Sequence, residues 1–312
     1  LLRDALARQA RQRVQATTGV GLGAQIGSEQ REKWVRRISN LIDILDALLS
    51  AISIFAICRV PFEEDRDRNA GQAFVRDPEI VQFVVDQGVK FVTTSAGSPT
   101  KYTGQLKEAG LTVFHVVPTL DAALKAVDAG VDGLVVEGAE GGGFKNPKDV
   151  STMVLLPLVR SRVDVPIIAA GGITCGRTMA AAFALGAEAV QMGTRMVSAA
   201  ESPVHDNWKQ AIVEAKETDT VYLNRFHSPA LRALRTERTS RLERMIEENV
   251  WGQFGDAKAL YFGGDMEAAI PLTGQVAGRI ESVRPVAEIL ADVQREFFEV
   301  LGGLAGRYLE AP

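Results

Sequence analysis

The chain has 312 residues, of which 46% are hydrophobic and 24% are charged, and its net charge is −4 from 35 basic and 39 acidic residues. This composition is typical of a globular protein with a large core, and the near balance of charge argues against nucleic acid or an anionic membrane as a partner. Two cysteines, Cys58 and Cys175, are too few for a disulfide framework, so we expect a reducing, cytoplasmic setting.

The most apolar window, residues 41–58, contains Asp43 and Asp46 and is too short and too charged to span a bilayer. Elsewhere, segments of helical period alternate with short apolar runs. The predicted helices are 31–49, 78–87, 100–109, 120–129, 153–162 and 178–185. The predicted strands are 52–57, 90–94, 113–117, 133–136, 167–170 and 189–192. This alternation predicts a parallel sheet covered by helices.

Glycine follows several of the predicted helices, where it allows the chain to turn into the next strand. These glycines are Gly88, Gly110, Gly130 and Gly186. The repeat favours an α/β fold of the (β/α)₈ barrel type over an open sheet. Residues 231–248 and 285–304 are predicted to be helical, as a lid and a closing helix. We therefore expect a barrel formed by 1–222 and 270–312, with a mostly helical lid at 223–269.

Two neighbouring predicted strands end in glycine. The run 165–173 contains Gly171 and Gly172, and the run 189–195 contains Gly193 and Thr194. Ligands of parallel α/β proteins bind beyond the carboxyl ends of the strands, and glycine there exposes backbone N–H groups that suit a phosphate. The pattern predicts a phosphate cradle, although such turns also occur in barrels that bind nothing at this corner.

Between about residues 77 and 237 the sequence resembles the FMN-dependent nitronate monooxygenases, formerly called 2-nitropropane dioxygenases, and the related FMN-dependent enoyl-acyl carrier protein reductases. The matching runs are 93–99 (TTSAGSP), 137–143 (EGAEGGG), 169–173 (AAGGI), 191–195 (QMGTR) and 201–205 (ESPVH). The resemblance implies a barrel that binds FMN and acts on a small molecule, with O₂ or NAD(P)H as the second substrate. We expect no metal site, and the sequence leaves a homodimer open.

The resemblance also implies a flavin site. Glu137 matches a position that holds the ribityl hydroxyls, and Gly142 and Gly143 match the loop beside the isoalloxazine ring. The phosphate cradle would consist of Ala170, Gly171, Gly172, Gly193 and Thr194, with Gln191 beneath it. Arg195 would balance the phosphate charge or form a salt bridge at the strand end. Residues 273–278 match, more weakly, a segment near the flavin.

The sequence departs from the family at its amino-terminal end. Family members begin with a strand that carries a Gln-Gly-Gly-Met-like turn, and no such turn is found here. Residues 21–27 resemble the family's second strand. Ala56 or Cys58 stands near the usual place of an asparagine that faces the flavin, and neither offers an amide. Either the first strand lies outside this sequence or this branch holds its flavin with fewer side-chain contacts.

A second departure concerns the chemistry. The family's glycine-rich loop ends in a histidine that acts as general base or proton donor, whereas this chain has Phe144. A phenyl ring cannot transfer a proton, so the catalytic acid or base is unknown. His115 lies in an apolar strand and is expected to be a core residue, and His205 is expected to order a loop. His227, on the loop 222–229, is a weak candidate.

Three functions follow from the resemblance. A nitronate is already an anion, so a site without a base can oxidise it through FMN and O₂, and Phe144 would then line the substrate pocket. The same apolar surface suits a flavin-dependent reductase of an enoyl thioester that uses NAD(P)H. The third function is a catalytically degenerate barrel that binds FMN without turnover.

Overall fold

The computed structural model describes residues 79–86, 88–95 and 97–308, all within one compact unit, residues 45–312. The predicted helix 31–49, the predicted strand 52–57 and the departures at 21–27, Ala56 and Cys58 lie outside the described residues.

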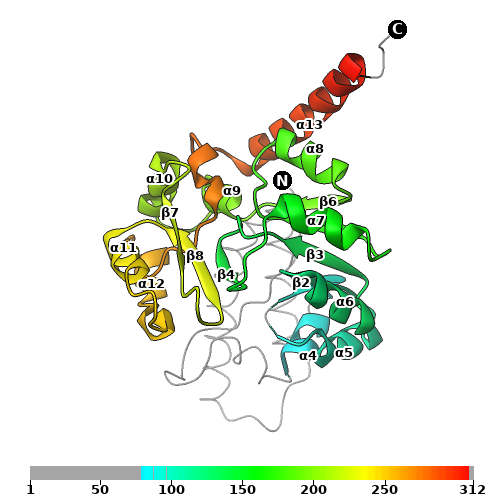
Figure 1. Ribbon diagram of the computed structural model, residues 1–312, viewed down its shortest axis with the longest axis horizontal. Coiled ribbons are helices and arrows are strands. Elements are labelled where there is room, and N and C mark those ends of the chain that lie inside the picture. The colour runs from blue at the N-terminus through cyan, green and yellow to red at the C-terminus, as the bar shows by residue number, and fades with distance from the viewer. Residues whose placement is uncertain (1–78, 87, 96, 309–312) are drawn as a thin grey trace, which may run out of the picture. The chain divides into compact units, whose positions relative to one another are not determined.

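Five parallel strands form the main sheet, in the order β1-β2-β3-β5-β6 (Figure 1). The strands are β1 (Phe91–Thr94), β2 (Thr112–Val117), β3 (Gly133–Glu137), β5 (Ile167–Ala170) and β6 (Ala189–Gln191). Helices α4 (Glu79–Asp86), α5 (Thr103–Glu108), α6 (Leu120–Asp128), α7 (Thr152–Arg160) and α8 (Gly176–Ala184) alternate with them, and a 3₁₀ turn (Pro99–Lys101) precedes α5. The predicted α/β alternation is confirmed, with element ends that differ by a few residues. The helix-ending glycines Gly88, Gly110, Gly130 and Gly186 all have positive φ, as predicted.

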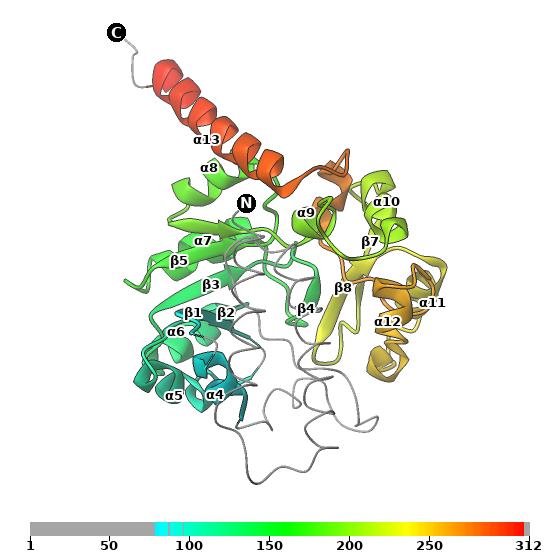
Figure 2. The same cartoon turned by 180° about the vertical axis from the view of Figure 1, so that it is seen from behind.

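The two faces of this sheet carry different side chains. One face packs against the helices, and its buried residues include Val113, Leu134 and Ile167. In both views, α5, α6, α7 and α8 lie along this side (Figure 2). The opposite face carries a separate cluster that includes Val135, Ile168 and Ala170. Because side chains alternate along a strand, this second face corresponds to the interior of a barrel.

A second sheet was not predicted. It is antiparallel, in the order β4-β8-β7, and consists of β4 (Gly143–Lys145), β7 (Thr220–Leu223) and β8 (Ala230–Leu234). The expected helix over 231–248 is therefore wrong in its first part, since α11 (Glu237–Glu243) begins only after β8. Leu231 and Ala233 are fully buried in a cluster with Ile270, so pairing of β8 with two strands outweighs its helical pattern.

The remaining helices surround the second sheet and close the chain. They are α9 (Thr194–Val197), α10 (Asp206–Glu214), the 3₁₀ helix η2 (Val250–Gln253), α12 (Ala257–Tyr261), the 3₁₀ helix η3 (Gln275–Arg279) and α13 (Val286–Tyr308). The closing helix α13 was predicted, and Val293 and Phe297 on it are buried where it lies against α8. Within the described part of the chain, no helix is both long and apolar enough to cross a membrane.

Candidate functional site

Three of the predicted site residues occupy adjacent strand ends. Glu137 pairs in register with Ala170, and Ala170 pairs with Gln191. Ala170 belongs to the barrel-interior cluster, so the residues that share its row face the same side of the sheet. The carboxyl ends of β3, β5 and β6 therefore place a carboxylate and an amide on either side of a small residue.

The turn after β5 requires glycine at both positions. Gly171 and Gly172 have φ of +84° and +79°, which L-residues rarely adopt. A Cβ on Gly171 would lie 2.9 Å from the carbonyl oxygen of Gly138, so this turn packs directly against the loop after β3. The structure thus places residues 138–141 next to the turn at Gly171.

The turn after β6 is open where the phosphate cradle was predicted. A Cβ on Gly193 would meet no atom within 4 Å, and the backbone N–H groups of Gly172, Gly193 and Thr194 donate to no other described residue. The side-chain oxygen Oε1 of Gln191 is buried without a hydrogen-bond partner in the described structure. Free N–H groups beside open space and an unsatisfied amide suit a phosphate and its polar attachment, so the residues present fit FMN.

The segment 273–278 lies beside this turn. The Thr194 hydroxyl accepts a hydrogen bond of 2.8 Å from the N–H of Gly274, and the N–H of Gln275 donates to the carbonyl oxygen of Glu140 at 2.9 Å. A Cβ on Gly142 would lie 2.6 Å from the Gly274 nitrogen. The structure thus brings together the glycine loop, the α9 turn and the 273–278 segment that the sequence linked only by resemblance.

Lys145 is a residue of this region that the sequence reasoning missed. Its side chain is only 3% exposed, and its Nζ lies 2.6 Å from Oε1 of Glu137. Neighbouring side chains on a strand point to opposite faces, but the sequence did not predict β4, so no local signal separated Lys145 from Phe144. Lys145 points toward the end of β3, and Phe144 points the other way.

Phe144 lies on the face of β4 opposite to Lys145, where it contacts Trp251 of the 3₁₀ helix η2. Its ring centroid is 5.4 Å from that of Trp251, and the residue is 40% exposed. The two rings form an aromatic surface, and no protonatable group occupies this position.

Tyr222 and Arg232 form a buried polar contact behind β4. The Tyr222 hydroxyl donates to the carbonyl oxygen of Asn146, and the Arg232 guanidinium lies 4.9 Å from the centre of the Tyr222 ring. Burial, reinforced by Asp149, raises the pKa of Tyr222 to about 12. Burial lowers the pKa of Arg232. Tyr222 therefore keeps its proton at neutral pH and serves as a hydrogen-bond donor.

No described contact joins any of the three histidines to the residues at the carboxyl ends of β3, β5 and β6. His115 is 6% exposed, lies 2.8 Å from the Thr94 hydroxyl through Nδ1, and has its pKa lowered to about 4 by burial, as befits the expected core residue. His205 caps α10 by accepting the N–H of Asn207, which confirms its loop-ordering role. His227, the weak catalytic candidate, lies in the β7–β8 turn, with Nε2 3.0 Å from the carbonyl oxygen of Glu247.

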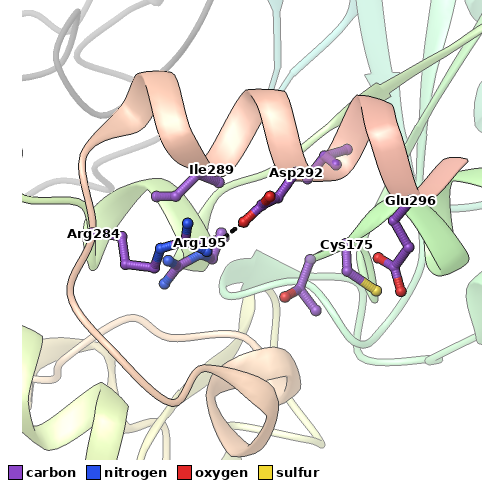
Figure 3. Close-up of a pocket in the computed structure, with 8 residues that line it drawn as sticks. Cys175, Arg195, Arg284, Ile289, Asp292 and Glu296 are labelled. Atoms are coloured by element: carbon purple, nitrogen blue, oxygen red, sulfur yellow. Dashed lines mark hydrogen bonds and ion pairs between the residues drawn. The ribbon is translucent and has the colours of Figure 1, made fainter.

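Arg195 lies beneath α13, beside Ile289 (Figure 3). Its Nη1 donates to Ser198 Oγ at 3.1 Å and to the carbonyl oxygen of Ser282 at 3.0 Å, and it has no carboxylate partner among the described residues. Burial, followed by the nearby charge of Arg284, lowers its pKa. Its guanidinium lines a cavity of about 110 Å³ between α8 and α13. Neither of the expected roles, a salt bridge or a phosphate contact, is supported by these contacts.

No group of three or more His, Cys, Asp or Glu side chains within the described residues is placed to hold a metal ion. The donor set at the strand ends consists instead of backbone N–H groups, one amide, one carboxylate and one ammonium. Such a set suits an organic phosphate ester with a polar chain.

Comparison with solved structures identifies the fold. The structure of FabK from Thermotoga maritima superposes with a TM-score of 0.70 at 40% identity, over 75% of this chain and 76% of that one. Nitroalkane oxidase from Streptomyces ansochromogenes has a TM-score of 0.61 at 24% identity, over 72% and 68% of the two chains, and shows the shared fold alone. The fold is therefore of the TIM-barrel type, of which the described residues form a curled part.

The curated relatives include members of one family of oxidoreductases. A (3aS,4S,5R,7aS)-5-hydroxy-7a-methyl-1-oxo-octahydro-1H-indene-4-carboxyl-CoA dehydrogenase of Mycobacterium tuberculosis is 35% identical over 203 residues, 64% of this chain and 56% of the relative. A probable nitronate monooxygenase of Staphylococcus haemolyticus is 34% identical over 167 residues, 50% and 47% of the two chains. The chain spans about half the length of these relatives. Because the nitronate monooxygenase family model matches residues 58–296, this chain belongs to the nitronate monooxygenase family.

Proposed function

We propose that this chain binds FMN and catalyses the oxidation of alkyl nitronates with O₂. Support for FMN comes from the open turn at Gly193, where free backbone N–H groups meet unoccupied volume, and from the family. Support for a nitronate comes from Phe144, which replaces a group able to remove a proton. A neutral nitroalkane must lose an α-proton before oxidation, whereas a nitronate has already lost it.

In this proposal the protein binds and orients, and the cofactor supplies the redox chemistry. The N–H groups of Gly172, Gly193 and Thr194 would hold the phosphate. Gln191 and Glu137 would contact the polar chain of the cofactor. When bound, FMN would take electrons from the substrate and pass them to O₂.

A second candidate is favoured by the aromatic surface of Phe144 and Trp251. The exposed part of Phe144, with the partly buried Trp251 beside it, offers apolar area to a hydrophobic acyl group. One relative is named as a carboxyl-CoA dehydrogenase, which is consistent with an acyl thioester as substrate. We propose an NAD(P)H-dependent reductase of an enoyl thioester as this second function.

One anaerobic mixing experiment separates the functions. The FMN-loaded protein is mixed with an alkyl nitronate, with NADPH or with buffer, and flavin absorbance is followed. Bleaching by the nitronate alone supports the oxidase, and bleaching by NADPH supports the reductase. Loss of both signals in a protein that holds FMN would leave a binding barrel without turnover, and failure to bind FMN would refute the whole proposal.

A further inference from the structure

Lys145 is a buried cation to which the proposed reaction assigns no role. Its only charged partner among the described residues is Glu137, whose side chain is 23% exposed. The two groups lie at ion-pair distance, but no hydrogen bond of good geometry involves the Lys145 Nζ. Apart from the Glu137 carboxylate, the three N–H groups of this 3% exposed ammonium have no described acceptor. Burying an ammonium is unfavourable unless its charge and its donors are compensated.

The ammonium lies where the candidate site begins. A Cβ on Gly141 would lie 2.7 Å from Nζ and 2.6 Å from Glu137 Oε1, so Nζ sits against the glycine loop that follows β3. Pairing of Lys145 with Ala230 fixes the direction of β4 at this point. The position is therefore set by two elements distant in sequence, the end of β3 and the strand β8.

We propose that Lys145 supplies the positive charge of the flavin site, with Glu137 fixing its ammonium. The inference rests on the proposed binding of FMN and goes further, because it assigns a role to a residue beyond the resemblance. A fixed cation in a water-poor site stabilises negative charge that develops beside it, such as the charge a cofactor gains on reduction. The unsatisfied N–H groups would then find their acceptor on the bound cofactor.

The test compares four proteins loaded with FMN: wild type, Lys145→Met, Lys145→Arg and Lys209→Met. Lys209 is a matched control, because its side chain is also buried, 8% exposed, and contacts one carboxylate, Asp206, at 3.2 Å. The measured quantity is the equilibrium constant for anaerobic reduction of the bound flavin against a reference dye. We expect Lys145→Met to lower this constant by at least about tenfold, as removal of a nearby unit charge implies. The constant for Lys145→Arg should stay within about threefold of the wild-type constant, and the constant for Lys209→Met should equal the wild-type constant.

A shift below about threefold in Lys145→Met, in a protein that still binds FMN, would overturn the inference and leave the proposed function standing. If wild type itself fails to bind FMN, the proposed function fails and the inference fails with it. Should Lys145→Met not fold, Lys145→Gln carries the same measurement, since it is neutral but keeps a polar end. Loss of folding in both neutral variants, with Lys209→Met folded, would show a structural role and also overturn the inference.

Discussion

The parallel sheet and the antiparallel sheet contribute to the candidate site in different ways. At the ends of β5 and β6, the features that suit a ligand belong to the backbone: two glycines with positive φ, an open turn and free N–H groups. On β4, the relevant features belong to side chains, with Phe144 on one face and Lys145 on the other. In our proposal the first region holds the cofactor phosphate whatever the substrate, and the second region can vary without disturbing that binding.

This difference predicts which changes abolish cofactor binding and which alter chemistry. Substitutions at the backbone turn should remove FMN altogether. Substitutions on β4 should leave FMN bound and change reactivity. Substitutions on the helix-facing side of the sheet should affect stability alone.

The largest effect is expected from Gly193→Leu. The residue has φ of −93° and open space at the Cβ position, so a side chain is compatible with the fold. That side chain would fill the volume proposed for the phosphate and remove two or more charged hydrogen bonds, which corresponds to at least about a hundredfold loss of FMN affinity. Fluorescence titration with FMN measures the affinity, and thermal melting without FMN checks the fold.

Gly302→Leu is the matched control for this change. Gly302 lies in α13 and also has no atom within 4 Å of its Cβ position. We expect the Gly302→Leu variant to bind FMN with the affinity of wild type. If Gly193→Leu binds FMN as tightly as wild type, the phosphate lies elsewhere. The proposed difference between the strand-end turns and β4 would then no longer hold.

The next effect concerns Phe144→His on β4. If position 144 faces the substrate, an imidazole there should raise the rate with neutral nitroalkanes by about a hundredfold or more, because general-base catalysis has that magnitude. The rate with nitronates should hardly change. Initial rates with both substrate forms, at matched FMN occupancy, measure the selectivity.

Phe226→His provides the control, since Phe226 is 71% exposed in the β7–β8 turn and should give no gain. Equal wild-type rates on neutral and anionic substrates would contradict the hypothesis, because another residue would then already act as base. A variant that melts at lower temperature and gains no activity would show that Phe144 only packs against Trp251.

The two regions also differ in how well the sequence predicted them. The described parallel strands were predicted from the alternation of helical segments with apolar runs and from the glycines that end the helices. Both signals are local in the sequence. The sequence did not reveal β8, since Leu231 and Leu234 fit a helical period and only pairing with β4 and β7 makes the segment a strand. Lys145 was missed for the same reason, because its direction depends on its pairing with Ala230.

A smaller effect, on stability, is expected from His115 on the helix-facing side. Its pKa is lowered to about 4 by burial, so the folded protein keeps it neutral where the unfolded chain, with a pKa near 6.5, binds a proton. Stability from this group is complete above about pH 6.5 and decreases as the pH falls toward 4, by up to about 3 kcal/mol. Urea unfolding from pH 7 to 4 should show a shallower decrease in His115→Gln than in wild type. Parallel curves for the two proteins would show that His115 is not the titrating group.

The smallest effect on FMN binding is expected from Arg195→Met, two residues after Gly193. Its guanidinium donates to Ser198 Oγ and to the carbonyl oxygen of Ser282 and lines the cavity beside α13. Loss of these hydrogen bonds should reduce the free energy of unfolding by about 1–3 kcal/mol, because the Ser282 carbonyl loses a charged donor. FMN affinity should change less than about threefold, since no contact to the phosphate is removed. Urea unfolding and FMN titration measure the two quantities, with Arg241→Met on the exposed face of α11 as control. The opposite pattern, a hundredfold loss of affinity with unchanged stability, would show that this side chain reaches the phosphate and that the cradle is not made by the backbone alone.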